Sequence, residues 1–233
     1  MRIQQTPSPN FDTRRDGALP SLIVLHQTEN EDVVHCTDCY MGHKILEHGR
    51  ISPHYLIGLD GVAWQFVADK NRAWHAGKSW WCGKEDVNSH SIGIEMLGAR
   101  LSPFPAAQLD ALRTLVNDLQ CKWDIPAQGV LGHNDIAPDR KFDPGPLFPW
   151  RNMAVDGIGV WPEAAESICD ADQVVPLLRQ IGYTAPVQDA ELVTGFQIHY
   201  VPEIWTDGTG QAGVACTLTR QRLFALHRKL CHT

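Results

Sequence analysis

The segment GHNDIAPDRKFDPG, residues 132–145, concentrates ionisable side chains between an apolar run and a group of prolines. His133 and Asp143 lie at its two ends, and the prolines between and after them restrict the backbone, which lowers the entropy cost of holding two ligands. Zinc in proteins is bound by His, Cys and carboxylate side chains, and a catalytic site keeps three of them. The alternative is a histidine at a strand end and an aspartate that forms a turn before Pro144. Spacing alone leaves both interpretations open.

Three short apolar runs lie upstream or at the start of this segment: SLIVLH ends at His26, SIGIE at Glu95 and GVLGH at His133. The first two are rich in β-branched residues, which favours buried strands, and the third is a weaker pattern. Because ligands bind where the strands of an α/β sheet end, we expect His26, Glu95 and His133 to meet at one edge of a sheet.

Two further patterns complete an α/β domain around one sheet. The run HYLIGLDGVAWQFV, residues 54–67, alternates apolar positions around Asp60-Gly61, a two-residue turn signal, and predicts a β-hairpin. Residues 105–120, PAAQLDALRTLVNDLQ, repeat leucine and valine at three-to-four spacing and predict an amphipathic helix. Pro105 is suited to the first turn of that helix.

The composition changes after GPLFPW. Residues 151–170 contain glycine and proline without periodicity, and we interpret them as a surface linker or a domain edge. Helical patterns follow at residues 172–181, 189–200 and 217–230. Three short helices enclose only a small hydrophobic core, so we expect them to pack against the first domain. We therefore divide the chain into domains at residues 1–165 and 166–233.

The overall composition limits the partners and the compartment. A net charge of −7 is unsuited to phosphate-backbone binding, so no nucleic acid is expected. No apolar run approaches the roughly 18 residues of a membrane span, and the first residues have no signal-peptide pattern. The seven cysteines indicate free thiols. We expect a cytoplasmic monomer, or an envelope protein if an export signal has been removed.

Two charged residues are candidates for catalysis beside the metal ligands. Glu95 ends an apolar strand, where partial burial raises a carboxyl pKa toward that of a useful general base. Lys141 precedes Asp143 by two residues and is able to stabilise an oxyanion. The alternatives are a strand-edge glutamate that faces water and a solvated lysine, and spacing alone favours the solvated lysine.

The chain resembles the zinc-dependent N-acetylmuramoyl-L-alanine amidases of the AmpD/AmiD type, within the amidase-2 and peptidoglycan recognition protein superfamily. The matching blocks are IVLHQT, SPHYLIGLDG, RAWHAG, NSHSIGIEM and LGHNDIAPDRKFDPGPLFPW, which occur in order across most of residues 20–150. The resemblance implies a central mixed β-sheet flanked by helices. The C-terminal helices are similar, more weakly, to the small peptidoglycan-binding module of longer members.

Carried over by position, the resemblance assigns one zinc per chain to His26, His133 and Asp143. It makes Glu95 the catalytic carboxylate and Lys141 the stabiliser of the transition state. Two further positions, His75 and Asn88, are implied to line the substrate groove. The implied reaction is hydrolysis of the amide bond between N-acetylmuramoyl, or its 1,6-anhydro form, and L-alanine in peptidoglycan or its turnover fragments.

The sequence departs from the family at Gln27, where many relatives have tyrosine after the first metal histidine. It also contains Cys36, Cys39, His43 and His48, which match the spacing of a second zinc site, although the family implies none there and reduced cysteines on a flanking helix or loop are the alternative.

A non-catalytic peptidoglycan recognition module is the alternative function. Such relatives keep the fold and lose a metal ligand, whereas all three ligands and Glu95 are present here. A redox or structural zinc centre at Cys36 and Cys39 is a third interpretation, and it explains none of the matching blocks.

Overall fold

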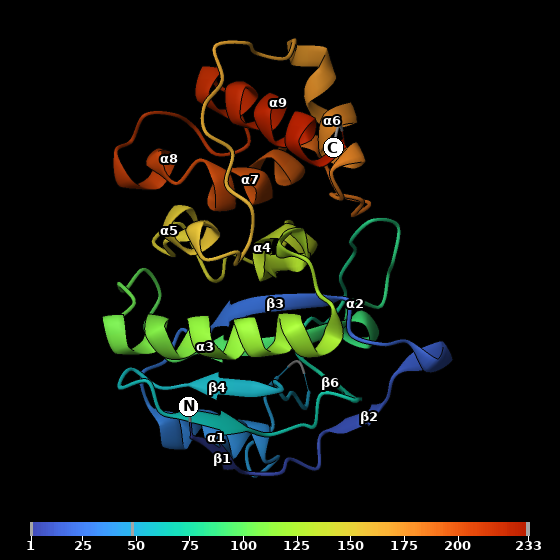
Figure 1. Cartoon of the computed structure of the whole chain (residues 1–233), viewed down its shortest axis with the longest axis vertical. Helices are drawn as coiled ribbons and strands as arrows, with labels where there is room; N and C mark the ends of the chain where they lie inside the picture. The colour runs from blue at the N-terminus through green and yellow to red at the C-terminus, as the bar shows by residue number, and fades with distance from the viewer. Residues whose placement is uncertain (1, 48, 232–233) are drawn as a thin grey trace.

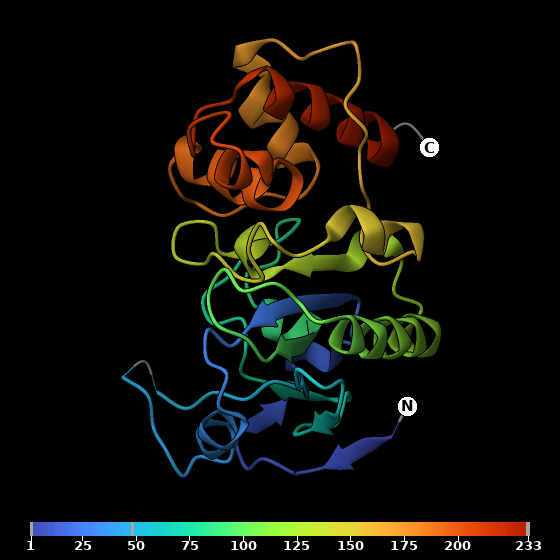
Figure 2. The same ribbon diagram turned by 90° about the vertical axis from the view of Figure 1, so that its left-hand side faces the viewer.

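The computed structural model describes residues 2–47 and 49–231. A layer containing the main sheet lies at one end, and the helices of residues 171–231, here called the C-terminal helical region, lie at the other (Figure 1). Between them lie α4 (His133–Ile136) and α5 (Trp150–Val155), as a view turned by 90° also shows (Figure 2). The segment with the metal-ligand candidates is therefore placed between the sheet and the C-terminal helices.

The main sheet has six strands in the order β1-β5-β4-β7-β3-β8. Their bounds are Ile3–Gln5 (β1), Ala63–Gln65 (β5), Tyr55–Ile57 (β4), Ser91–Met96 (β7), Leu22–Gln27 (β3) and Val130–Gly132 (β8). The β4–β5 pair is antiparallel and the other pairs are parallel, so the sheet is mixed, as the resemblance implies. A separate antiparallel pair joins β2 (Phe11–Thr13) to β6 (Asn71–Ala73).

The remaining helices cover the sheet or form the C-terminal helical region. They are α1 (Val33–Tyr40), α2 (Val87–His90), α3 (Ala106–Trp123), α6 (Val174–Gln180), α7 (Asp189–Tyr200), α8 (Glu203–Thr206) and α9 (Thr217–Cys231). Short 3-10 turns lie at Arg15–Gly17, Ala127–Gly129 and Ala171–Gln173. The predicted helices at residues 105–120, 172–181, 189–200 and 217–230 are confirmed as α3, α6, α7 and α9.

The sheet buries apolar side chains on both faces. On β4, Tyr55 and Ile57 belong to the core that contains Leu112 of α3, whereas Leu56 belongs to a second cluster with Tyr40 of α1. Successive strand side chains point to opposite faces, so these helices lie on opposite sides of the sheet. The predicted fold of a mixed sheet flanked by helices is confirmed.

Three local predictions need correction. The third apolar run ends as a strand at Gly132, and His133 begins α4, because the carboxylate of Asp135 accepts from the Gly132 N–H at 2.7 Å and starts a helical turn. The connection between β4 and β5 is longer than two residues, since Gly58 N–H donates to the Val62 carbonyl at 2.8 Å. The segment interpreted as a linker begins within α5.

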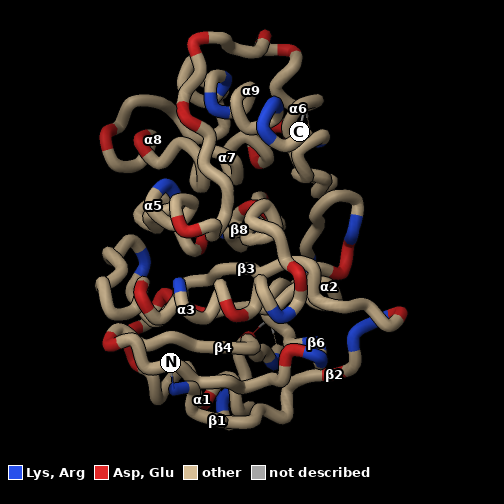
Figure 3. The backbone as a smooth tube through the Cα atoms, in the orientation of Figure 1, with Lys and Arg blue, Asp and Glu red and all other residues tan. Residues whose placement is uncertain are grey.

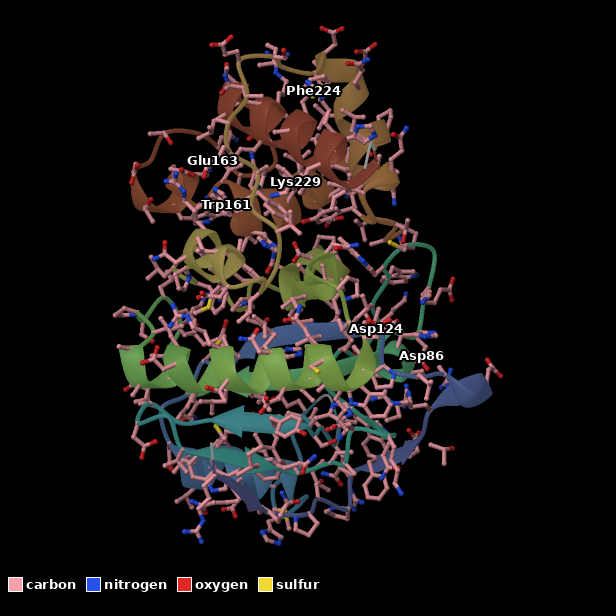
Figure 4. The ribbon with its side chains drawn as sticks, viewed as in Figure 1. Asp86, Asp124, Trp161, Glu163, Phe224 and Lys229 are labelled. Atoms are coloured by element: carbon pink, nitrogen blue, oxygen red, sulfur yellow. The ribbon has the colours of Figure 1, made fainter. Side chains whose placement is uncertain are left out.

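The C-terminal helices pack against the first part of the chain, as expected because three short helices enclose only a small core of their own. Buried residues of α7 and α9, such as Phe196 and Leu226, belong to the same hydrophobic core as Ile23 of β3. Trp161, in the segment after α5, lies beside α9, and the Lys229 ammonium donates to its carbonyl at 3.4 Å (Figure 4). The division at residues 165 and 166 stays a prediction, because one core extends across it.

Candidate metal centre and catalytic cavity

Three side chains from the ends of two parallel strands and the following loop converge on one point. The Nδ1 atoms of His26 and His133 are 2.9 Å apart, and Oδ2 of Asp143 lies 3.2 Å and 3.1 Å from them. All three residues are buried, with exposures of 1%, 2% and 8%. The backbone N–H of Asn134 donates to the Asp143 carbonyl at 3.0 Å, which joins the two ends of the ligand loop (residues 132–145).

The outer nitrogens of both histidines already have acceptors. Nε2 of His133 lies 3.1 Å from the Ala76 carbonyl, which only accepts, so in the neutral imidazole the proton is on Nε2 and Nδ1 has a free lone pair. Nε2 of His26 lies 2.9 Å from Nδ1 of His75. Nε2 of His75 lies 3.1 Å from the Ser91 hydroxyl, which donates to the Val87 carbonyl at 2.7 Å. These hydrogen bonds are all satisfied if His26 donates to His75, His75 to Ser91 and Ser91 to the Val87 carbonyl. In that arrangement Nδ1 of His26 also carries no proton.

This donor set fits a zinc ion. Two bare imidazole nitrogens and a carboxylate oxygen face one another, so a cation there supplies the positive charge that they lack. Tetrahedral zinc with ligand bonds of 2.0–2.1 Å requires ligand atoms about 3.3 Å apart, close to the spacing here. Burial and the neighbouring His133 lower the pKa of His26 to about 4, which keeps its imidazole neutral, the form that binds metals.

Glu95 lies beside the ligands on β7. Burial, and secondly the charge of Asp143, raise the pKa of its carboxyl to about 8, while Lys141 acts in the opposite direction. Its Oε2 atom is buried and has no hydrogen-bond partner among the described residues. A carboxyl with this pKa exchanges its proton near neutral pH, which is the property that a general base or acid requires.

The candidate residues line one cavity of about 1070 Å³. It contains all seven predicted site residues: His26, His75, Asn88, Glu95, His133, Lys141 and Asp143. Acidic and basic positions are interspersed along the backbone (Figure 3). The cavity wall includes five basic side chains, Arg50, Lys78, Arg100, Arg140 and Lys141, and four acidic ones, Glu29, Glu95, Asp139 and Asp143. The wall also includes Thr194 and Ile198 of α7, so the C-terminal helices contribute to it.

The two predicted groove residues also hold other parts of the site. The Asn88 side-chain oxygen accepts from the backbone N–H groups of His75 and Ala76 at 3.0 and 2.8 Å. His75 supports His26, and it needs Gly93 beside it, because a Cβ on Gly93 would lie 2.3 Å from the imidazole Cγ of His75. Sequence reasoning missed this support, and the glycine inside SIGIE was its only local signal.

The described residues of the second zinc motif do not form a metal site. Among residues 2–47 and 49–231, the one group with metal-ligand spacing is His26, His133 and Asp143. Cys36 and Cys39 are buried on α1, and burial raises the pKa of Cys36 to about 12, which disfavours the thiolate that binds zinc. The exposed His43 pairs with Asp38 at 3.3 Å. His48 lies outside the described residues.

The family model for N-acetylmuramoyl-L-alanine amidases, Amidase_2, matches residues 16–146. Among curated proteins, the N-acetylmuramoyl-L-alanine amidase AmiD of Escherichia coli is 34% identical over 232 residues, covering 84% of this chain and 81% of its own length. The 1,6-anhydro-N-acetylmuramyl-L-alanine amidase AmpD of Salmonella typhimurium is 36% identical over 163 residues, covering 64% of this chain and 87% of its own length.

Solved structures show the same relationship. A complex of Escherichia coli AmiD with anhydro-N-acetylmuramic acid-L-Ala-D-gamma-Glu-L-Lys superposes with a TM-score of 0.74 at 31% identity and covers 92% of each chain. The crystal structure of AmpDH3 from Pseudomonas aeruginosa gives a TM-score of 0.78 at 27% identity, covering 94% of this chain and 95% of its own.

The mixed sheet, with a two-histidine, one-aspartate group that could hold a metal ion where β3 and β8 end, is the arrangement on which the class of protein rests. The chain belongs to the N-acetylmuramoyl-L-alanine amidase family, Amidase_2, and is an enzyme of that family. No helix in the described ranges is long and apolar enough to cross a bilayer.

Proposed function

We propose that this amidase is a zinc hydrolase that uses His26, His133 and Asp143 as metal ligands and Glu95 and Lys141 in catalysis. The bond cleaved joins the lactyl carbonyl of N-acetylmuramic acid, or its 1,6-anhydro form, to the nitrogen of L-alanine. The observation that carries the proposal is the convergence of two imidazole Nδ1 atoms and one carboxylate oxygen beside Glu95 in one cavity. When bound there, zinc supplies a Lewis acid that polarises a carbonyl and lowers the pKa of water.

Glu95 carries the proton transfers. Its carboxylate accepts a proton from the water that attacks the amide carbonyl, and the new carbon–oxygen bond forms as the carbonyl electrons move to oxygen. The carboxylic acid then donates that proton to the alanine nitrogen as the carbon–nitrogen bond breaks. A pKa near 8 supports both roles, because neither protonation state is strongly favoured near neutral pH.

Lys141 stabilises the negative charge that develops on the carbonyl oxygen. It lies on the ligand loop between His133 and Asp143 and lines the cavity with Glu95. Its charge lowers the pKa of both His26 and Glu95, which supports a role for Lys141 at the reacting centre. A fixed cation at this point favours the transition state over the neutral amide of the ground state.

The substrate class is a peptidoglycan fragment with its stem peptide. Two related structures were solved with anhydromuramic peptides, and curated relatives carry the 1,6-anhydro amidase name. The basic residues in the wall suit a peptide with several carboxylates. His75 and Asn88 border the same cavity, and we keep them as substrate-contacting candidates beside their supporting contacts.

The same proposal places the enzyme in the cytoplasm as a monomer. The cysteines that the structure describes are all free thiols, which suits a reducing compartment. Cell fractionation and light scattering test these two points. A non-catalytic recognition module is disfavoured, because the three ligands and Glu95 face one cavity.

The test combines metal content with turnover. Purified protein is expected to hold one zinc per chain and to release L-Ala-D-Glu-diaminopimelate from an anhydromuropeptide, and EDTA is expected to abolish release. Adding back zinc is expected to restore it. Protein that binds the muropeptide without zinc and without cleavage would instead be a recognition module.

A further inference from the structure

A fully buried carboxylate lies on the ligand loop, two residues after His133, and has no part in the proposed reaction. The Asp135 side chain has 0% exposure. Its Oδ2 accepts from the Gly132 N–H at 2.7 Å, and its Oδ1 lies 3.3 Å from the side-chain nitrogen of Asn134. These contacts fix the turn that begins with His133, but they use only part of the hydrogen-bonding capacity of the carboxylate.

The remaining two donors come from the C-terminal helical region. The Tyr183 hydroxyl donates to Oδ1 at 2.5 Å, and Nδ1 of His199 donates to Oδ2 at 2.7 Å. The His199 ring is stacked between Trp150 and Tyr200, with centroids 3.7 and 3.8 Å away. Burying a carboxylate without hydrogen-bond donors is strongly unfavourable. Tyr183 and His199 therefore supply donors to Asp135 that the ligand loop alone does not provide.

The backbone of α7 approaches the same loop directly. The Asn134 side-chain nitrogen donates to the Gly195 carbonyl at 2.9 Å. A Cβ on Gly195 would lie 2.7 Å from the Pro138 Cβ and 2.8 Å from the Asn134 carbonyl oxygen. Glycine is therefore required for this distance between helix and loop. The Asn134 side-chain nitrogen thus links the Gly195 carbonyl to the Asp135 carboxylate, and Gly195 also lies against Pro138 in the middle of the ligand loop.

We propose that Asp135, Tyr183 and His199 are positioning residues, through which the C-terminal helical region holds the ligand loop in its metal-binding geometry. This inference rests on the proposed function, because it acts through His133 and Asp143. The carboxylate fixes the Gly132–His133 backbone, and the two donors fix the carboxylate. The C-terminal helical region is then part of the metal centre's support, whether or not it also contacts glycan.

The test uses full-length variants that remove one donor and keep the ring. Tyr183→Phe deletes the hydroxyl, and His199→Phe keeps an aromatic ring between Trp150 and Tyr200 without the Nδ1 donor. Leu226→Ala is the matched control, because this buried leucine belongs to α9, which packs mainly on α6 and α7. Zinc affinity of EDTA-stripped protein is measured by competition with a chromophoric chelator, together with melting temperature, kcat and KM.

We expect both donor variants to weaken zinc binding by about tenfold or more, the effect typical of residues that orient metal ligands. We expect kcat at limiting zinc to fall with little change in KM, and Leu226→Ala to lower the melting temperature while keeping wild-type zinc affinity. Donor variants that lose melting temperature but bind zinc as the wild type does would overturn the inference and leave the proposed function standing. Wild-type protein that binds no zinc would contradict both.

Discussion

His26 and Glu95 are register partners on the adjacent parallel strands β3 and β7. Register partners on neighbouring strands lie about 4.8 Å apart, and their side chains point to the same face of the sheet. A metal ligand and the proposed general base are therefore set beside one another by backbone pairing. The remaining ligands, His133 and Asp143, come from the ligand loop that follows β8 on the other side of β3.

Replacing Asp143 with alanine is expected to remove zinc and activity together. The carboxylate is the one anionic ligand, and without it two neutral imidazoles remain to hold a dication. Metal analysis after dialysis and a peptide-release assay measure the two losses. Asp118→Ala, at an exposed position on α3, is the control. Full activity without bound metal in Asp143→Ala would exclude the assigned ligand set.

The Glu95→Gln variant is expected to keep its zinc and lose about 10²- to 10⁴-fold in kcat, because the amide cannot accept the proton of the attacking water. Single-turnover peptide release with metal analysis separates this loss from a loss of metal. Glu163→Gln is the control, since Glu163 pairs with Arg151 at the surface (Figure 4). Normal turnover by Glu95→Gln would rule out its role as the base.

Lys141→Met is expected to lower kcat by about 10²- to 10³-fold with zinc retained, as when one oxyanion-stabilising group is lost. Because the Lys141 charge lowers the pKa of Glu95, its removal should raise that pKa further. The acid limb of the pH profile of kcat/KM is then expected to move to higher pH. Lys141→Arg, which keeps the charge, should leave the limb in place. An unshifted limb in Lys141→Met would show that this charge does not act on Glu95.

His75→Phe is expected to weaken zinc binding by about tenfold or more, because Nε2 of His26 loses its acceptor while the ring volume is kept. Ser91→Ala removes only the hydroxyl that hydrogen-bonds to His75, so it should weaken zinc binding by a smaller factor. Chelator competition on both variants measures this order. Equal zinc affinity in His75→Phe and wild type would limit His75 to the cavity wall.

Acid sensitivity of the fold is expected from His54. Burial, and secondly the charge of Arg14, lower its pKa to about 3 from 6.5, while Asp69 acts in the opposite direction. Between these values the unfolded chain binds more protons than the folded one, so the unfolding free energy falls as the pH falls through this range. His54→Gln should flatten the dependence. Urea titrations from pH 7 to pH 4 test it, and parallel curves for the two proteins would contradict it.

Much of the fold could be predicted from local patterns of apolar residues in the sequence. The β-branched runs that end at His26 and Glu95 became β3 and β7, and the repeat of residues 189–200 became α7. Three-residue strands such as β1 are too short for any periodicity to be visible. The helix α1 had one local signal, Asp32, whose carboxylate caps the N–H groups of Val34 and His35.

The sequence by itself provided the candidates for the site: residue types and spacing left their roles open, and the family resemblance of the surrounding blocks predicted which histidines, which aspartate and which glutamate belong together. Only the tertiary structure decided what supports them. His75 lies within hydrogen-bond distance of His26 although 49 positions separate them in the sequence, and His199 donates to Asp135 over a separation of 64 positions. Such pairs leave no spacing pattern, since hydrogen bonds between buried side chains depend on how the strands and helices pack and not on their separation along the chain.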